Sequence, residues 1–145
     1  MRKTFWVGVL PFIILFLSCN ADNSTESDSY KEMKSKYTLL TVSQLWSAMT
    51  SGTSDYDGTY LLVQGGLLSV GTNTVTLIDT TTDKAVTTEF EESIDLTTLK
   101  NVLSNNTDST ASYTVTIGGI CHYYEDTTSY PYLDSCDYFY VNDDA

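Results

Sequence analysis

The stretch TYLLVQGGLLSV, residues 59–70, decides which kind of fold the chain adopts. Its apolar residues form an extended run, and Gly65 and Gly66 interrupt that run near its middle. Paired glycines inside a strand pattern indicate a bulge or a sharp coil of the strand. We therefore predict one long strand that bends at the two glycines.

Short helices and short strands are predicted on either side of this strand. Upstream, Thr41 and Gln44 form a capping-box pattern, and apolar residues recur at helical spacing as far as Met49. Downstream, a second helix is predicted from Asp95, its candidate cap, to residue 103. The other extended segments are predicted strands at residues 73–79, 84–90, 113–124 and 132–141.

The resulting order is helix, three strands, helix and two strands, which is the plan of an OB-fold. In that fold, five strands form a partly open Greek-key barrel. We expect residues 37–145 to be one mainly β domain of this kind. A helix lies between its third and fourth strands, and another helix lies at its N-terminal end. A segment of this length suffices for one small domain and not for two.

Four short motifs in these strands resemble those of bacterial OB-fold lipoproteins of the tRNA-anti-like family. They occur in the family's order over roughly residues 58–141. The motifs are Val63-Gln64-Gly65, Val75-Thr76-Leu77, Gly119-Ile120-Cys121 and Leu133-Asp134-Ser135-Cys136. The resemblance implies an OB-fold barrel, and it implies single-stranded nucleic-acid binding as one possible function.

The first 20 residues, MRKTFWVGVLPFIILFLSCN, have the layout of a bacterial secretion signal. Two basic residues precede an apolar run, residues 5–17, that is shorter than the about 20 residues of a membrane-spanning helix. The segment from Leu15 to Cys19 resembles a lipobox. We therefore expect residues 1–18 to be a signal peptide and Cys19 to be lipidated. An ordinary signal peptide with an incidental cysteine is the alternative.

The lipid would anchor the protein to a bacterial membrane, on its periplasmic side or at the cell surface. Several acyl chains hold a protein stably at a membrane, whereas one chain binds only marginally. Residues 19–36 are polar and charged, with almost no apolar residue to bury. We predict that they form a flexible acidic tether between the lipid and the domain.

The charge of the chain argues against nucleic acid as a partner. Without Arg2 and Lys3, the seven basic residues are reduced to five lysines, which face 19 acidic residues and give a net charge of −14. Nucleic-acid affinity comes mostly from Lys and Arg side chains that neutralise phosphates. An acidic surface repels such polyanions. A protein or a neutral glycan fits this surface better.

Cys121 and Cys136 lie in the two C-terminal strands of a chain that is predicted to be exported. Oxidising compartments favour disulfides, and a bridge here would stabilise the fold by about 3 kcal/mol. Strict alternation along the last strand, however, places Cys136 on the face of Tyr138 and Tyr140. The pairing therefore depends on how the strands bend at residues 118–119. A disulfide is our prediction, with free buried thiols and a metal site as the alternatives.

No catalytic or metal-binding pattern is apparent in the sequence. His122 is the only histidine, and Cys121 beside it would point to the opposite face of a strand. None of the common nucleophile, zinc or phosphate-binding motifs is present. Residues 55–58 and the pair Glu91–Glu92 are interpreted as solvated turns, with weak calcium binding as the alternative. We predict a protein that is not an enzyme and that needs no cofactor.

Six of the 11 tyrosines of the chain cluster in the last predicted hairpin. Tyrosine is a favoured strand residue with an apolar ring and a polar tip, so structural use explains many of them. Aromatic faces of OB-fold barrels are also places where bases or sugars stack. We therefore predict a binding module for a protein or a neutral glycan, with its face at Tyr123, Tyr124, Tyr130, Tyr132, Tyr138 and Tyr140.

Overall fold

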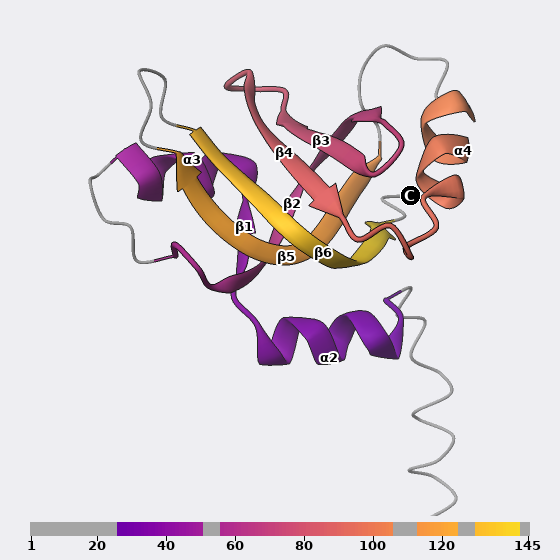
Figure 1. Ribbon diagram of the computed structural model, residues 1–145, viewed down its shortest axis with the longest axis horizontal. Coiled ribbons are helices and arrows are strands. Elements are labelled where there is room, and N and C mark those ends of the chain that lie inside the picture. Colours follow the sequence, from indigo (N-terminus) through magenta and orange to yellow (C-terminus); the bar gives the residue numbers. More distant parts are fainter. Residues whose placement is uncertain (1–25, 51–55, 106–112, 125–129, 143–145) are drawn as a thin grey trace, which may run out of the picture.

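The computed structural model describes residues 26–50, 56–105, 113–124 and 130–142. They form a mainly β molecule, with a closed barrel of five strands, one additional strand and three helices (Figure 1). In chain order the elements are α2 (Asp28–Lys36), β1 (Leu39–Thr41), α3 (Val42–Thr50), β2 (Tyr60–Val70), β3 (Thr74–Asp79), β4 (Lys84–Phe90), α4 (Thr97–Asn105), β5 (Thr114–Tyr124) and β6 (Tyr130–Asn142).

The barrel is closed because β2 pairs with β3 on one side and with β5 on the other. The strands follow one another in the order β2, β3, β4, β6 and β5, and β5 pairs again with β2. All these pairs are antiparallel except β4 with β6, which is parallel. The short strand β1 adds a parallel edge to β2. Closure satisfies backbone groups that an open sheet leaves unpaired at its edges.

Strand β2 changes partners at the predicted glycine pair. Gly66 lies opposite Thr114 of β5 on one side and opposite Ile78 of β3 on the other. The register of β2 against β3 then shifts between residues 67 and 69. The predicted irregularity is therefore confirmed, and its bulge falls just beyond the glycines. This corner lets one strand contribute to both sides of the barrel.

A second irregularity, in β6, decides the position of Cys136. Gly118 of β5 pairs with Tyr138, whereas Ile120 pairs with Asp134, so β6 has two more residues than β5 between these points. Ser135 lies inside the extra segment with a positive φ of 49°. The extra residues rotate the strand, and Cys136 is fully buried instead of sharing the outer face of Tyr138.

Gly119 provides the space that this arrangement needs. A Cβ atom at Gly119 would collide with the sulfur atom of Cys136, and it would lie only 2.9 Å from the carbonyl oxygen of Asp134. Cβ atoms are essentially never found so close to other heavy atoms. The second glycine pair of the sequence is therefore a point of close packing between β5 and β6.

The core fills the barrel and is covered by parts of α3 and α4. Helix α3 contributes buried side chains at Val42, Leu45 and Met49, and α4 contributes Leu99. Trp46 packs at the edge of the core, and its indole N–H donates to the carbonyl oxygen of Ala85 at 2.9 Å. The largest fully buried side chains of the strands are Leu61, Leu62, Leu77, Ile117 and Leu133.

Both helices of the barrel begin with the caps that the sequence predicts. At α3, the hydroxyl of Thr41 accepts from the backbone N–H of Gln44 at 3.2 Å, and the Gln44 side chain accepts from the N–H of Thr41 at 2.9 Å. This is the reciprocal capping box. At α4, the Asp95 carboxylate accepts from the N–H of Thr97 at 3.0 Å. The two helix starts are thus confirmed.

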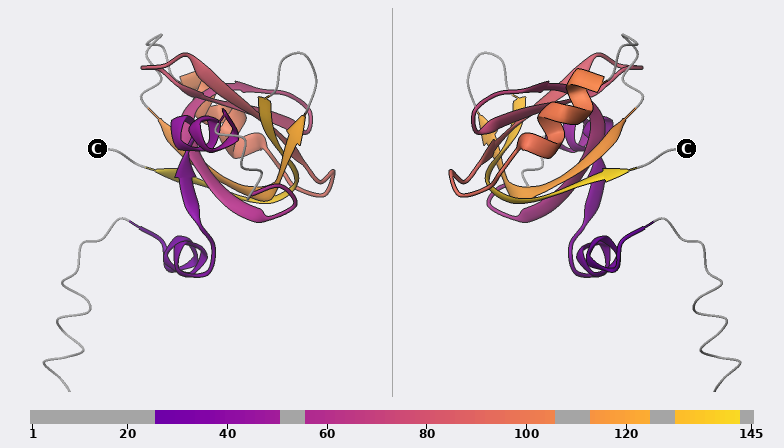
Figure 2. Two further views of the ribbon diagram at one scale, coloured as in Figure 1. Left: turned by 90° about the vertical axis from the view of Figure 1, so that its left-hand side faces the viewer. Right: turned by 90° about the vertical axis from the view of Figure 1, so that its right-hand side faces the viewer.

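Helix α2 corrects the predicted tether. Its residues belong to the segment 19–36, which we expected to be flexible, yet Ser27 caps a helix in which Tyr30 is buried. Figures 1 and 2 show α2 outside the barrel, against the outer side of β5 and β6. Tyr30 and Ser29 of this polar segment contact the sheet, at Tyr140, Thr116 and Tyr138.

Candidate binding face

The six predicted tyrosines do not form one continuous surface. They lie on the paired strands β5 and β6, where Tyr132 is opposite His122 near the hairpin turn, and Tyr138 and Tyr140 are toward the other end. Tyr123 packs against the hydrophobic core. Tyr124 pairs with Tyr130 across the strands, but its side chain lies outside the described part of the structure. Two separate groups of aromatic side chains therefore remain.

The first group is the hairpin-tip face, which we define as His122, Tyr130, Tyr132, Asp57 and Asp134. The rings of His122 and Tyr132 stack with centroids 5.3 Å apart and an interplanar angle of 26°. His122 Nε2 lies 3.0 Å from Asp134 Oδ2, and His122 Nδ1 lies 3.8 Å from Asp57 Oδ1. Tyr130 is 42 % exposed. This face therefore combines aromatic rings with two carboxylates that flank His122.

The two carboxylates leave the hairpin-tip face with unused acceptors. A carboxylate offers about four acceptor positions, of which the contact with His122 uses one on Asp134. The five described lysines lie elsewhere: three are on α2, Lys84 lies over the ring of Trp46, and Lys100 is on α4. The face is suited to a ligand with hydroxyl donors and without negative charge.

The second group, Tyr138 and Tyr140, is covered by α2. The ring of Tyr30 stacks on that of Tyr140 with centroids 4.2 Å apart and an interplanar angle of 12°. The Tyr30 hydroxyl lies 3.2 Å from the hydroxyl of the fully buried Thr116. Burial raises the pKa of Tyr138 above its ordinary value. Helix α2 thus covers part of these two tyrosines, which are half-buried.

Cys121 and Cys136 are free thiols in the structure, so the predicted disulfide is wrong here. Cys121 lies directly opposite Leu133 on β6, and Cys136 is three residues further along that strand. A disulfide requires Cα atoms within about 7 Å and Cβ atoms that face each other. Burial raises the pKa of each thiol to about 12. The alternative of two buried, protonated thiols is the one the structure contains.

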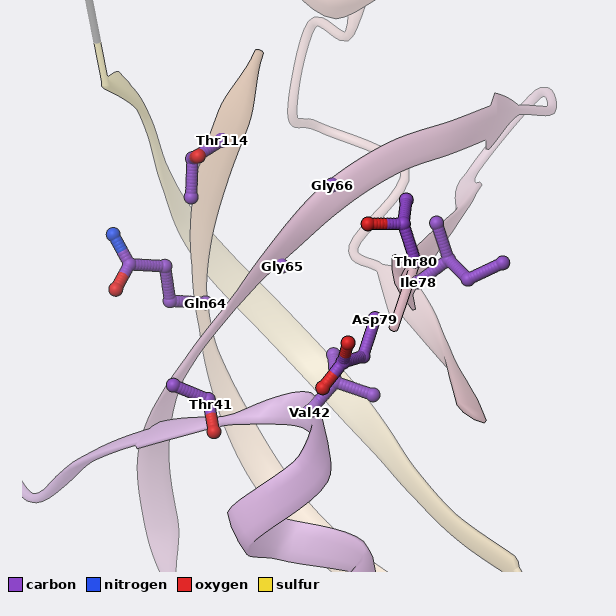
Figure 3. Close-up of a pocket in the computed structure, with 9 residues that line it drawn as sticks. All are labelled: Thr41, Val42, Gln64, Gly65, Gly66, Ile78, Asp79, Thr80 and Thr114. Carbon is purple, nitrogen blue, oxygen red and sulfur yellow. The ribbon is translucent and has the colours of Figure 1, made fainter. Parts of the chain in front are cut away.

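A pocket of about 410 Å³ lies at the corner of β2. Figure 3 shows that its lining comes from the start of α3, the bend of β2, the end of β3 and the start of β5. Asp79 accepts hydrogen bonds from the hydroxyl and the backbone N–H of Thr81, and these bonds lower the pKa of Asp79. No aromatic ring lines the pocket. The hairpin-tip face is therefore the better stacking surface. The lining residues are Thr41, Val42, Gln64, Gly65, Gly66, Ile78, Asp79, Thr80 and Thr114.

The acidic candidates do not form a metal site in the described part of the chain. Glu91 and Glu92 line a shallow hollow with Glu89 and Asp134. Across residues 26–50, 56–105, 113–124 and 130–142, no group of three or more His, Cys, Asp or Glu side chains is arranged to hold a metal ion. Asp55, the first residue of the calcium-like stretch, lies outside these ranges.

The predicted signal and lipidation site also lie outside the described residues, because the first 25 residues, Cys19 among them, are not covered. None of the described helices is long and apolar enough to cross a membrane. The membrane anchor therefore stays a prediction of the sequence.

Sequence reasoning missed three residues that shape these surfaces. Tyr30 was counted as part of a tether, although Ser27, three residues before it, is a residue type that favours the start of a helix. Asp57 and Asp134 were not linked with His122, because only the strand pairing and the turn before β2 bring them together. Contacts between residues far apart in the chain left no local pattern to detect.

Comparison with known proteins adds no relative: no protein-family model matches the chain, and neither the curated proteins nor the solved structures contain a significant match.

Proposed function

We propose that this protein is a non-enzymatic binding module of the bacterial cell envelope, anchored through a lipid on Cys19, and that its hairpin-tip face binds a neutral glycan. The observation that carries the proposal is that His122 stacks on Tyr132 and lies between the carboxylates of Asp57 and Asp134. This arrangement combines a stacking surface with hydrogen-bond acceptors. The lipid anchor rests on the lipobox pattern alone.

A sugar ring fits this combination for electrostatic reasons. The face of an aromatic ring carries partial negative charge, and the C–H groups of a sugar present partial positive charge to it. The hydroxyl groups of the sugar can donate to Asp134 and Asp57, which have acceptor positions left. Tyr130, at the exposed end of the face, extends the aromatic surface. Few, well-placed polar groups around an apolar surface are typical of ligand sites.

We further propose that the barrel is an OB-fold and that the motif resemblance to tRNA-anti-like lipoproteins reflects it. The strand order β2, β3, β4, β6, β5 with closure between β5 and β2 supports this assignment. So does α4, which follows the third barrel strand and precedes the fourth. OB-folds bind oligosaccharides as well as oligonucleotides, so the assignment is compatible with a glycan ligand.

Single-stranded nucleic acid is the alternative that the fold suggests. The charge disfavours it, because residues 37–145 contain two lysines and 15 acidic residues. A polyanion would have to approach carboxylates at the hairpin-tip face without cations to neutralise its phosphates. A neutral glycan meets no such repulsion.

The proposal is tested by the melting temperature of the protein against a panel of neutral glycans, cell-wall fragments and single-stranded DNA. A ligand that binds the native state raises the melting temperature by mass action. We expect a rise with a neutral glycan that is the same in low and high salt and that Tyr132→Ala abolishes. Tyr113→Ala, a tyrosine outside this face, is the matched control and should keep the rise. A rise with DNA alone would contradict the proposal.

A further inference from the structure

Helix α2 is attached to the barrel through very little surface. Tyr30 is its one buried residue, at 3 % exposure, and the remaining residues of the helix are exposed or half-buried. A helix of nine residues is marginal in water without tertiary support. Tyr30 is therefore the one buried contact of the helix with the barrel, and a hydrogen bond between Ser29 and Tyr138 adds a second contact.

Tyr30 occupies a site on the sheet that accommodates a phenol ring and its hydroxyl group. Tyr140 provides a parallel ring at 4.2 Å, and Thr116 provides a fully buried hydroxyl group 3.2 Å from the Tyr30 hydroxyl. Asn142 also reaches the Thr116 hydroxyl, at 3.5 Å. A buried hydroxyl needs a hydrogen-bond partner, so this socket favours a ring that bears one. Thr116, Tyr138 and Tyr140 together are called the α2 socket below.

The residue that follows α2 has its own contact with the barrel. Tyr37 ends the helix in extended conformation and packs against Tyr60, with ring centroids 4.3 Å apart. The hydroxyl of Tyr60 donates to Asp137 at 2.6 Å, which ties this contact to β6. Tyr37 is therefore held to the barrel by contacts that are separate from those of Tyr30.

The negative charge of the barrel favours a basic polypeptide segment over an acidic one at the α2 socket. Helix α2 carries three lysines against two acidic residues, whereas residues 37–145 carry two lysines against 15 acidic residues. Lys34 lies 4.6 Å from the ring centroid of Tyr30 and bonds to Glu26 at 2.7 Å. A tyrosine accompanied by lysines thus approaches this acidic barrel more favourably than one accompanied by carboxylates.

We propose that α2 is a detachable strap latched by Tyr30, and that the α2 socket is a docking site for a tyrosine in a lysine-bearing segment of a partner protein. In the closed state Tyr30 occupies the socket in place of the partner. This inference does not depend on glycan binding, because the hairpin-tip face shares no residue with the socket.

The strap is tested first by limited trypsin digestion of the full chain in detergent. Three of the seven basic residues, Lys31, Lys34 and Lys36, lie on α2, whereas Lys84 and Lys100 lie in the barrel elements. Tyr30→Ala should raise the rate of cleavage in α2 at least tenfold and leave the rates at Lys84 and Lys100 unchanged. An unchanged rate in α2 would show that Tyr30 is not the latch.

Two further variants keep the test decisive. Tyr30→Phe retains the ring and loses the hydroxyl, so its α2 cleavage should rise about fivefold, the effect of one lost hydrogen bond. If Tyr30→Ala also speeds cleavage at Lys84 and Lys100, it has unfolded the barrel, and Tyr30→Phe then decides the question. Met33→Ala, at a half-buried position of the same helix, should change the rate little.

The socket is tested with a peptide that copies residues 26–37. In NMR titrations at millimolar concentration, it should shift the signals of Thr116 and Tyr140 in the Tyr30→Ala variant. Wild type should bind it at least tenfold more weakly, because its own α2 competes at an effective concentration in the millimolar range. A peptide with alanine in place of its first tyrosine should not bind. Equal binding of both peptides, or no binding to the released variant, would overturn the docking site.

Discussion

At the scale of single residues, the two strand cysteines show how a local irregularity overrides a compositional expectation. Export from the cytoplasm favours a disulfide. The extra residues of β6, however, set Cys121 opposite Leu133 and carry Cys136 into the core beside Gly119. The sequence pattern showed that strict alternation would place Cys136 on the face of Tyr138. It could not predict the bulge that buries Cys136, because a bulge depends on the pairing of two strands.

The state of the thiols can be counted directly. We expect the Cys19→Ser variant to react slowly with dithiobis(nitrobenzoate) at pH 8, because only a thiolate is the nucleophile and burial raises the pKa of both thiols to about 12. In guanidinium without a reductant, the same sample should release two equivalents. No release in the denaturant would mean that Cys121 and Cys136 are bridged.

The raised pKa values also predict a loss of stability in alkali. A thiol that ionises near 9.0 when unfolded and near 12 when folded stabilises the native state fully below pH 9, and this contribution decreases as the pH rises toward 12. The free energy of unfolding from urea titrations should therefore decrease between pH 9 and pH 10. A variant with alanine at both positions, although less stable throughout, should decrease less over this interval; an equal decrease would argue against buried thiols.

Gly119 gives a sharp test of the packing between β5 and β6. Gly119→Ala places a methyl group against the Cys136 sulfur and 2.9 Å from the Asp134 carbonyl oxygen, so we expect a loss of about 1–3 kcal/mol in the free energy of unfolding. Adding Cys136→Ala to this variant should cost less than Cys136→Ala costs in the wild type, because it removes one of the two clashes. Urea titrations of the four proteins measure this coupling, and strict additivity would contradict it.

At the scale of elements, local signals predicted the helices of the barrel well. Thr41, Gln44 and Asp95 make the predicted capping contacts, since these depend on residues three or fewer positions apart. The strands followed from alternating apolar residues, and the bend of β2 followed from its glycines. Helix α2 was missed because it is held by contacts with β5 and β6, and its own sequence is too polar to indicate burial.

The capping box of α3 should contribute measurably to stability. Thr41→Ala removes the acceptor for the Gln44 backbone N–H, which typically costs about 0.5–2 kcal/mol. Thr98→Ala, at an exposed position in α4, is the control and should stay within about 0.5 kcal/mol of the wild type. Urea unfolding compares the two variants. A Thr41→Ala variant as stable as the wild type would show that the capping box does not stabilise α3.

At the scale of the whole molecule, the fold arranges two aromatic surfaces on the outer side of one hairpin. The hairpin-tip face is open, whereas the α2 socket is covered by Tyr30. The composition indicated a protein that is rich in tyrosine and acidic. The division of the tyrosines into two groups was not predictable, because it results from a helix that returns to the sheet.

The measurement that tests the central proposal most directly is the affinity for a neutral glycan at two salt concentrations. We expect the dissociation constant to be the same within twofold at about 50 mM and 500 mM salt, because no phosphate contacts are involved. Tyr132→Ala should weaken binding at least tenfold, and Tyr113→Ala should leave it unchanged. A steep loss of binding at high salt, or full binding by Tyr132→Ala, would contradict a glycan site at the hairpin-tip face.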